Sequence, residues 1–328
     1  MNPQVWTSLE EASGPCVVSV GTFDGVHRGH RVVVQTARAV ADRIGLPLVV
    51  LTFDPHPMSV VRPGTQPPAV ATVRHRVELL GRSGADAVLV LPFDSSVAAL
   101  SADEFIDLVL VHALDAHAVV VGDDFRFGHR AGGDVALLRD RGAERGFEVV
   151  AVAPVGHQGV RWSSTEVRRR VGAGDVAGAA DVLGHLFEVE GPVGRGDQRG
   201  RALGYPTANL AVAPGMLVPA DGVYAGYLRR LDAPLHVMPA AVSVGTNPTF
   251  DGSTRRVEAY VLDGDTIDGD TLDLYGVEVA ISFVARLRGQ QRFDDVPGLV
   301  AQMALDVART REALEAVDAS ALSARWPT

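Results

Sequence analysis

Strand-length apolar runs alternate with longer amphipathic stretches through the first half of this chain. The runs are rich in Val and Leu and are apolar on both faces, which is typical of parallel strands covered on both sides. They lie at Val17–Val20, Leu48–Phe53, Ala87–Leu91, Ala118–Val121 and Phe147–Val152. The helix-like stretches lie at Gly29–Ile44, Thr72–Gly84, Ser101–Leu114 and Gly133–Arg145, and Ser101 with Glu104 predicts a capping box. This alternation predicts a doubly wound, Rossmann-like α/β domain that binds ligands at the carboxyl ends of its strands.

The pattern changes in the second half of the chain. A short helical region spans Ser163–Leu186, and from Phe187 onward short strand-like runs are broken by Gly, Pro and Asp turns. These runs are Phe187–Gly191, Gly222–Leu231, Val237–Val244, Arg256–Leu262 and Val277–Val284. One helical stretch follows at Val296–Val317, and we expect a frayed tail after it. The pattern predicts an antiparallel β-barrel with a terminal helix, and domains at residues 1–186 and 187–328.

All 30 basic residues are Arg, and the sequence contains no Lys. A Walker A phosphate loop, a protein-kinase ATP site and Schiff-base catalysis each require a Lys and are therefore excluded. Genomic base composition is the simplest explanation for an Arg-only chain. Any phosphate bound here must be held by Arg, His, backbone N–H groups or a metal ion.

Charge and hydropathy exclude further classes of protein. The net charge is −10, and no Arg-rich block is long enough to serve as a nucleic-acid-binding arm. No apolar run approaches the roughly 18 residues that span a membrane, and no signal-peptide pattern is present. The single cysteine, Cys16, excludes an internal disulfide and is expected in the core. We therefore expect a cytoplasmic globular protein that binds neither nucleic acid nor membrane and is a monomer or weak homo-oligomer.

The segment Gly21–His30, between the first strand and the first helix, is the strongest local signal. Its glycines allow a tight turn and close approach to a ligand, and the helix N-terminus that follows suits phosphate. His27 and His30 can donate hydrogen bonds to phosphoryl oxygens and stabilise charge during displacement at phosphorus. A lone His here would more simply be a cap or a buried polar residue, but the pair in this context favours a phosphate site.

A second segment, Arg161–Arg168, places Ser163, Ser164 and Thr165 at the start of a predicted helix. In isolation, helix capping is the better interpretation of these hydroxyls. Beside a histidine turn we favour an anion clamp, in which hydroxyls, N–H groups and the two arginines hold phosphate.

Two further motifs follow the second and fourth predicted strands. They are Thr-Phe-Asp-Pro-His-Pro at residues 52–57 and Gly-Asp-Asp-Phe-Arg-Phe-Gly at residues 122–128. With His-x-Gly-His and Ser-Ser-Thr-x-x-Arg, they resemble the FMN adenylyltransferase module of prokaryotic bifunctional riboflavin kinase/FAD synthetases, within the nucleotidyltransferase superfamily. All four motifs are expected at the carboxyl ends of strands, where doubly wound folds bind their ligands.

The resemblance implies roles for these residues. His27 and His30 would be catalytic in adenylyl transfer. ATP would be held by Gly21, Phe23, Asp24, Gly29, Arg161, Ser163, Ser164, Thr165 and Arg168. FMN would lie beside Asp54, Pro55, His56, Pro57, Asp124 and Phe125. Asp124 departs from the Asn of many relatives, which leaves its contact open.

In the second half, Thr207 and Asn209 are two residues apart and would share a face of an extended strand. A hydroxyl and an amide oxygen are hard ligands suited to Mg²⁺, although a solvated strand face is the simpler interpretation of these residues alone. Glu258 lies in a strand-like run, where its carboxylate can act as a general base. Without further context, simple surface exposure would explain Glu258 equally well.

Five features of this half occur in order: the Gly-rich loop 191–196, Pro-Thr-Ala-Asn at 206–209, Asn-Pro-Thr-Phe at 247–250, Glu258, and Asp-Leu-Tyr-Gly at 273–276. The series resembles the riboflavin kinase module. It implies ATP bound at Gly194, Gly196, Arg201, Gly204, Thr207 and Asn209, riboflavin at Asn247 and Thr249, Mg²⁺ at Thr207 and Asn209, and Glu258 as the base that activates the ribityl hydroxyl. The acidic stretch Gly264–Thr271 is a departure, which we interpret as an elongated hairpin.

The two resemblances together cover about residues 14 to 311. They predict an enzyme that phosphorylates riboflavin with ATP in the barrel and transfers AMP from ATP to FMN in the α/β domain, giving FAD and pyrophosphate. One alternative is a nucleotidyltransferase for another phosphate acceptor, with a flavin-binding barrel that is not catalytic. A flavin-binding sensor or carrier without turnover is the other alternative. We expect ATP, riboflavin and FMN as substrates and Mg²⁺ as the cofactor.

Overall fold

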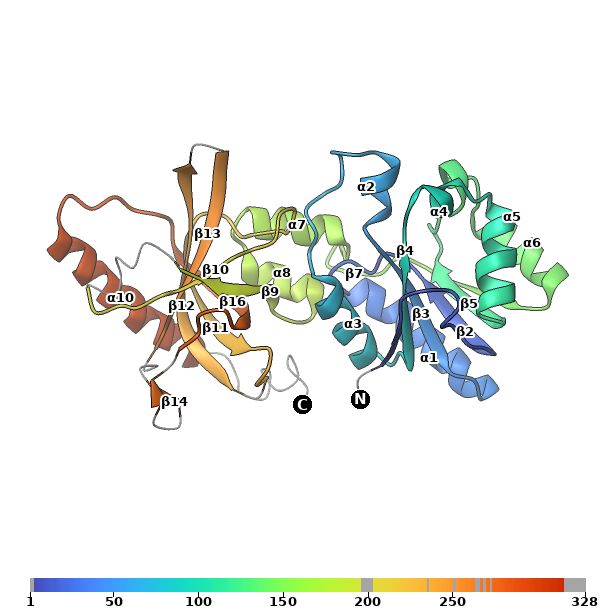
Figure 1. Ribbon diagram of the computed structural model, residues 1–328, viewed down its shortest axis with the longest axis horizontal. Helices are drawn as coiled ribbons and strands as arrows, with labels where there is room; N and C mark the ends of the chain where they lie inside the picture. The colour runs from blue at the N-terminus through green and yellow to red at the C-terminus, as the bar shows by residue number, and fades with distance from the viewer. Residues whose placement is uncertain are drawn as a thin grey trace. The chain divides into compact units, whose positions relative to one another are not determined.

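The computed structural model describes residues 3–195, 203–234, 236–249, 252–262, 266–267, 270–271 and 273–315. The chain divides into two compact units, each described separately below (Figure 1). The first comprises Met1–Pro67 and Thr72–Ser164, and the second comprises Pro68–Ala71 and Thr165–Thr328. The domain boundary near residue 186 stays a prediction. The frayed tail predicted at the C-terminus lies outside the described residues.

A six-stranded parallel sheet forms the centre of the first unit, in the order β1-β4-β3-β2-β5-β6. The strands are β1 (Gln4–Trp6), β2 (Cys16–Val20), β3 (Leu48–Asp54), β4 (Ala87–Pro92), β5 (Ala116–Gly122) and β6 (Glu148–Val152). All five predicted strands are confirmed, and β1 is an additional edge strand. The strand order reverses between β2 and β5, so the carboxyl ends of these strands flank the crevice where such sheets bind ligands.

Helices cover both faces of this sheet and bury a separate apolar cluster against each face. Helices α1 (Arg28–Ile44) and α3 (Val73–Arg82) cover one face, and α5 (Ala102–Phe105), the π-helix η1 (Ile106–Ala113) and α6 (Val135–Arg145) cover the other. Neighbouring strand residues alternate between the clusters, as Val17 and Val18 do. The doubly wound α/β prediction is therefore confirmed.

Cys16 lies in this core, as predicted. It is fully buried, and its Sγ donates to the carbonyl oxygen of Leu114 at 3.0 Å. Burial, with a smaller contribution from the Asp115 carboxylate, raises the pKa of the thiol to about 12. The thiol is therefore protonated and inert at neutral pH.

The predicted capping box at Ser101 is also confirmed: the Ser101 hydroxyl accepts from the Glu104 N–H at 3.2 Å, and the Glu104 carboxylate accepts from the Ser101 N–H at 2.7 Å. The helix predicted from this point is α5 continuing directly into η1. Shorter elements complete the unit: α2 (Pro57–Val61), α4 (Ser95–Ala99), the 3₁₀ helix η2 (His129–Ala131), and a hairpin of β7 (Gly156–His157) and β8 (Val160–Arg161).

The second unit contains a closed antiparallel barrel in the order β10-β13-β12-β11-β16-β9, which confirms the predicted architecture. Its strands are β9 (Phe187–Gly194), β10 (Ala208–Leu210), β11 (Gly222–Arg230), β12 (Val237–Thr249), β13 (Gly252–Val261) and β16 (Glu278–Arg288). Strand β10 was not predicted, and it pairs with both β9 and β13. Strands β14 (Thr266–Ile267) and β15 (Asp270–Thr271) form the expected extra hairpin.

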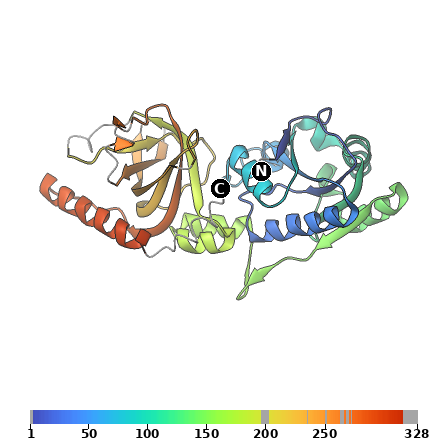
Figure 2. The same cartoon turned by 90° about the horizontal axis from the view of Figure 1, so that it is seen from below.

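Helices α7 (Ser164–Gly172), α8 (Val176–Leu183) and α10 (Val296–Glu315) confirm the predicted helical regions. Figure 2 shows α10 lying along the outside of the barrel, where Leu314 packs in one cluster with Tyr227 and Val284. A forked ion pair joins the helix to the end of β16: Arg288 Nε and Nη2 lie 2.9 and 2.6 Å from the two carboxylate oxygens of Asp306.

Candidate active sites

The turn between β2 and α1 carries the predicted nucleotide site of the first unit. His27 is the N-cap of α1, and its Nδ1 accepts a hydrogen bond from the His30 N–H at 3.2 Å. Phe23 and Val26 have φ values of +46° and +38°, a left-handed conformation that costs free energy in residues with a Cβ atom. Strain of this kind is concentrated at functional sites, which is consistent with the prediction.

Gly29 allows the turn to approach the second predicted motif closely. A Cβ atom at this position would lie 2.9 Å from the Trp162 carbonyl oxygen and 3.0 Å from the His27 ring. Next to this contact, the Ser164 hydroxyl donates to the Asp24 carbonyl oxygen at 2.9 Å. The histidine turn and the Ser-Ser segment therefore lie in contact, as their joint assignment to one site requires.

The rings of His27 and His30 are stacked, with centroids 3.6 Å apart and planes at 20°. Phe23 meets the His30 ring edge-on at 5.2 Å and also lies against Gly21, where a Cβ atom would be 3.1 Å from the ring. Burial, and after it the charges of His27 and Arg76, lower the pKa of His30 well below its ordinary value. His30 is therefore neutral at pH 7 and donates through one ring nitrogen.

The loop after β3 holds the predicted Asp-Pro-His-Pro motif. Asp54 ends the strand, and a cis peptide bond joins it to Pro55. His56 is the N-cap of α2, with its Nδ1 accepting from the Met58 N–H at 3.1 Å, and Pro57 is the first residue of that helix. His56 thus has a capping role that the sequence analysis did not predict. Its contact with FMN stays a prediction.

The loop after β5 holds Asp124 and Phe125 on the other side of the crevice. Asp124 Oδ2 lies 2.5 Å from Arg161 Nη2, and both side chains are more than half exposed. The Phe125 ring stacks on Phe127 with centroids 5.3 Å apart. In this structure Arg161 therefore pairs with the residue that departs from the family pattern, whereas the sequence predicts phosphate as its partner.

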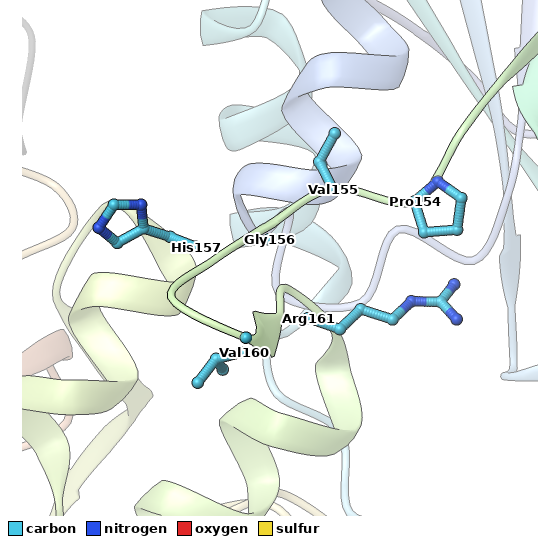
Figure 3. A pocket seen from close by; sticks show the side chains of 7 residues that line it. Pro154, Val155, Gly156, His157, Val160 and Arg161 are labelled. Atoms are coloured by element: carbon cyan, nitrogen blue, oxygen red, sulfur yellow. The ribbon is translucent and has the colours of Figure 1, made fainter.

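A pocket beside the β7–β8 hairpin precedes the clamp segment (Figure 3). It is lined by Pro154, Val155, Gly156, His157, Gly159, Val160 and Arg161. Figure 3 shows the His157 and Arg161 side chains extending in opposite directions from the hairpin. Among the predicted site residues, Arg161 alone lines this pocket, so the pocket does not coincide with the predicted substrate site.

The remaining clamp residues lie at the start of α7. Ser163 directly precedes the helix, and Thr165 is exposed. Arg168 belongs to the second unit, where its Nε donates to the Pro68 carbonyl oxygen at 2.7 Å. Contacts of these three residues with phosphate stay predictions.

Arg76 is a site residue that the sequence analysis missed. It lies on α3, is 5% exposed, and donates through Nη1 to the Thr52 hydroxyl at 3.1 Å and to the Phe53 carbonyl oxygen at 2.9 Å. A buried guanidinium at the ligand-binding end of a sheet is uncommon enough to point to function. The available signal was its position in line with Leu80, on the apolar side of the predicted helix.

In the second unit, strand pairing brings the predicted kinase residues together. Asn209 on β10 lies directly opposite Glu258 on β13, and Glu258 lies directly opposite Ser243 on β12. Residues opposite each other in an antiparallel pair project on the same face. The flanking residues Val257 and Ala259 are fully buried inside the barrel, so Asn209, Glu258 and Ser243 share its outer face.

Nearby contacts support this row, which we call the kinase face. Asn209 Nδ2 donates to the Thr207 carbonyl oxygen at 3.4 Å, and Gly194 at the end of β9 lies opposite Asn209. Gln290, which the sequence analysis also missed, donates to the Ser243 hydroxyl at 3.2 Å. Gly204 has a φ of +85°, a left-handed conformation that favours glycine.

The other predicted kinase residues are described only in part. Gly196 and Arg201 lie outside the described residues. The backbones of Asn247 and Thr249 belong to β12, opposite Thr254 and Gly252, and their side chains lie outside the described part. The roles of these four residues stay predictions.

Comparison with known proteins defines the class of this two-site molecule. The family model described as FAD synthetase matches residues 9–166, and the one described as riboflavin kinase matches residues 183–314. The chain is thus a transferase with an adenylyl-transferring half and a phosphorylating half. Within the part that the structure describes, no helix is both long and apolar enough to cross a membrane.

Individual relatives extend over most of the chain. The chain is 37% identical to the bifunctional riboflavin kinase/FMN adenylyltransferase of Escherichia coli K12 over 298 residues, covering 90% of this chain and 92% of the relative. The protein of that name from Pseudomonas fluorescens gives the same identity and shares over 297 residues. A crystal structure described as a macrolide-efflux protein from Streptococcus pneumoniae has a TM-score of 0.81 at 32% identity, covering 95% of this chain and 99% of that one.

The chain belongs to the family of bifunctional riboflavin kinase/FMN adenylyltransferases. It is an enzyme of flavin-cofactor biosynthesis with riboflavin kinase and FMN adenylyltransferase activities, as the sequence predicts.

Proposed function

We propose that FMN is adenylylated at the β2–α1 turn of the first unit and that riboflavin is phosphorylated on the kinase face of the barrel. The observation that carries this division is that each unit gathers its own set of predicted reactive residues. Stacked His27 and His30 lie at the switch point of the sheet, and Asn209 lies opposite Glu258 on the barrel. The principal groups proposed for each reaction therefore come from one unit.

In the first reaction, the phosphate of FMN attacks the α-phosphorus of ATP and pyrophosphate leaves. No residue of the chain needs to form a covalent intermediate, because FMN itself is the nucleophile. His27 and neutral His30 donate hydrogen bonds to phosphoryl oxygens as negative charge shifts towards pyrophosphate. The N–H groups at the start of α1 and the Arg161 guanidinium add positive potential around the triphosphate.

In the second reaction, the ribityl hydroxyl of riboflavin attacks the γ-phosphorus of ATP and ADP leaves. Glu258 accepts the proton of that hydroxyl as the oxygen–phosphorus bond forms. Glu258 is half-buried on the outer face, between the buried Val257 and Ala259. Transfer of a phosphoryl group depends mainly on positioning and charge stabilisation, and the strand face contributes the positioning.

The residues at Thr207 and Asn209 fit the proposed Mg²⁺. Their side chains offer a hydroxyl and an amide oxygen, both hard donors of the kind that Mg²⁺ prefers. The Asn209 amide nitrogen donates to the Thr207 carbonyl oxygen, so the amide oxygen is the atom left to bind a cation. When bound, Mg²⁺ would neutralise phosphate charge and orient the triphosphate beside Glu258.

The test is a product assay with purified full-length protein. Riboflavin with ATP is expected to give FMN and then FAD, and FMN with ATP is expected to give FAD and pyrophosphate, each separated by chromatography. Omission of Mg²⁺ is expected to stop both reactions. Formation of FAD from FMN without any FMN formation from riboflavin would contradict the proposed role of the barrel. Consumption of ATP with neither product would contradict the whole proposal.

A further inference from the structure

The side chain of Arg76 is buried at the ligand-binding end of the first unit. Its Nη1 is held by the Thr52 hydroxyl and the Phe53 carbonyl, both at the carboxyl end of β3. Its Nε is buried and has no hydrogen-bond partner among the residues that the structure describes. A buried cation with a donor left over is costly, so a purely structural link would be better made by a neutral side chain.

The Thr52 hydroxyl connects Arg76 to the histidine turn. It accepts from Arg76 Nη1 at 3.1 Å and donates to the Thr22 carbonyl oxygen at 3.0 Å. Thr52 is fully buried, and Thr22 directly precedes the strained Phe23. The hydrogen bonds therefore run in one direction, from α3 across the end of β3 into the turn that carries His27 and His30.

The charges around Arg76 belong to the two substrate loops of this unit. Burial lowers the pKa of Arg76, while the carboxylates of Asp24 and Asp54 act in the opposite direction. Asp24 lies in the histidine turn and Asp54 at the start of the predicted FMN loop. Arg76 also contributes, after burial and His27, to lowering the pKa of His30. The cation is thus coupled to both loops and to the histidine pair.

We infer that Arg76 is the positioning residue of the adenylyl-transfer site: through the Thr52 hydroxyl, it holds the histidine turn in register with the end of β3 that leads to the FMN loop. This inference rests on the proposed function of the turn. Arg76 acts through Thr52 and through its charge on His30, and it does not form or break a bond itself. Because a displacement of about 1 Å can cost about a hundredfold in rate, such a link is a determinant of turnover.

The test compares Arg76→Met, Arg76→Lys and Thr52→Val in the full-length protein. Arg76→Met removes the charge and keeps an aliphatic side chain of similar length. Arg76→Lys keeps the charge but lacks the planar guanidinium. Thr52→Val removes the hydroxyl at nearly constant volume. We expect kcat for FAD formation from FMN to fall about a hundredfold in Arg76→Met and about tenfold in the other two variants. KM for ATP should change less than kcat. Riboflavin phosphorylation in the second unit is the internal control and should stay within about twofold of wild type.

A histidine NMR titration of the free protein separates this role from simple structural support. In Arg76→Met the pKa of His30 should rise towards its ordinary value, because one of the charges that lower it is gone. In Arg76→Lys and Thr52→Val it should stay low, because the cation remains. The matched control is Arg74→Met, the same substitution at an exposed position of α3, which should change neither rate nor titration.

Normal FAD formation in either Arg76→Met or Thr52→Val would overturn the inference, as would an equal loss of both activities. If Arg76→Met does not fold, Thr52→Val decides alone. His27→Ala in the same assay tests the underlying function. If His27→Ala also forms FAD normally, the assignment of the turn has failed. If only the Arg76 and Thr52 variants do, the positioning role alone has failed.

Discussion

The two proposed sites are held in place by different kinds of interaction. In the first unit, His27 caps α1 and stacks on His30 of that helix, and hydrogen bonds through Thr52 connect the preceding strained turn to the buried Arg76. In the barrel, ordinary strand pairing sets Asn209 beside Glu258 and Ser243. The turn therefore depends on side chains packed far along the chain, whereas the kinase face depends on the backbone ladder.

The comparison teaches where each site is vulnerable. Substitution of a packing residue near the turn should impair adenylyl transfer without touching a substrate. On the kinase face, substitution of a reactive group should impair its own chemistry and leave its neighbours in place. Variants in one unit should also leave the reaction of the other unit intact.

The largest expected effect is that of Glu258→Gln on the kinase face. Loss of the general base should lower kcat for riboflavin phosphorylation by about 10² to 10⁴, because the amide cannot accept the proton. FAD formation from FMN should be unchanged. Separate initial-rate assays with riboflavin and with FMN measure this. The matched control is Glu278→Gln, at an exposed position of β16, and normal kinase turnover in Glu258→Gln would show that this residue is not the base.

The next effect is that of His27→Ala in the turn. Loss of a charge-stabilising donor should lower kcat for FAD formation by about 10² to 10³. Riboflavin phosphorylation should stay within about twofold of wild type, since the barrel keeps all its proposed groups. His157→Ala, at an exposed position of the hairpin in the same unit, is the control. An equal fall of both activities in a folded variant would refute the two-site assignment.

A smaller effect is expected from Asp124→Asn, which tests whether the Asp124–Arg161 ion pair competes with bound nucleotide. Removal of the carboxylate frees Arg161 to bind phosphate, so KM for ATP in FAD formation should fall about two- to fivefold at low salt, in keeping with the worth of an exposed ion pair. High salt should abolish the difference because it screens exposed charges. Asp123→Asn gives the same change in net charge at the neighbouring position. An unchanged KM at low salt would show that the ion pair does not compete with the nucleotide.

The smallest expected effect is a pH dependence of stability that arises from His30. Its pKa is lowered in the folded state, so as the pH falls below about 6.5 the unfolded chain binds a proton that the folded chain does not. The free energy of unfolding should then decrease by up to about 1.4 kcal/mol per pH unit. Urea unfolding followed by tryptophan fluorescence reports on the first unit through Trp6 and Trp162 when Trp326 is replaced by Phe in both proteins. His30→Asn should flatten this slope, and identical slopes in both proteins would contradict the lowered pKa.

The sequence predicted regular elements well because their patterns are long. The five predicted strands of the sheet and the five of the barrel carry enough apolar residues to show their period, and all are confirmed. Strands β1 and β10 escaped prediction because three residues are too short to display an alternation. Both are stabilised by pairing with distant strands, and a local pattern cannot reveal such partners.

The candidate sites were predictable as motifs but not as networks. The sequence pointed to His27, His30, Asn209 and Glu258, and the structure brings each pair together. It did not point to Arg76, because a position on the apolar side of α3 is a weak signal for an arginine, and burial of the guanidinium follows from tertiary packing. Nor did it indicate that Arg161 pairs with Asp124, since that contact joins residues 37 positions apart.

The alternation along β13 makes the kinase face sensitive to the parity of any insertion. If Val257 keeps its buried position, one extra residue before it in β13 leaves Glu258 on the outer face. One residue inserted between Val257 and Glu258 would instead turn the Glu258 carboxylate into the barrel interior. Two residues inserted there would restore the outward direction while moving Glu258 one pair further from Asn209. Changes in loop length around this barrel therefore leave the kinase face intact, whereas insertions within β10 or β13 disrupt it.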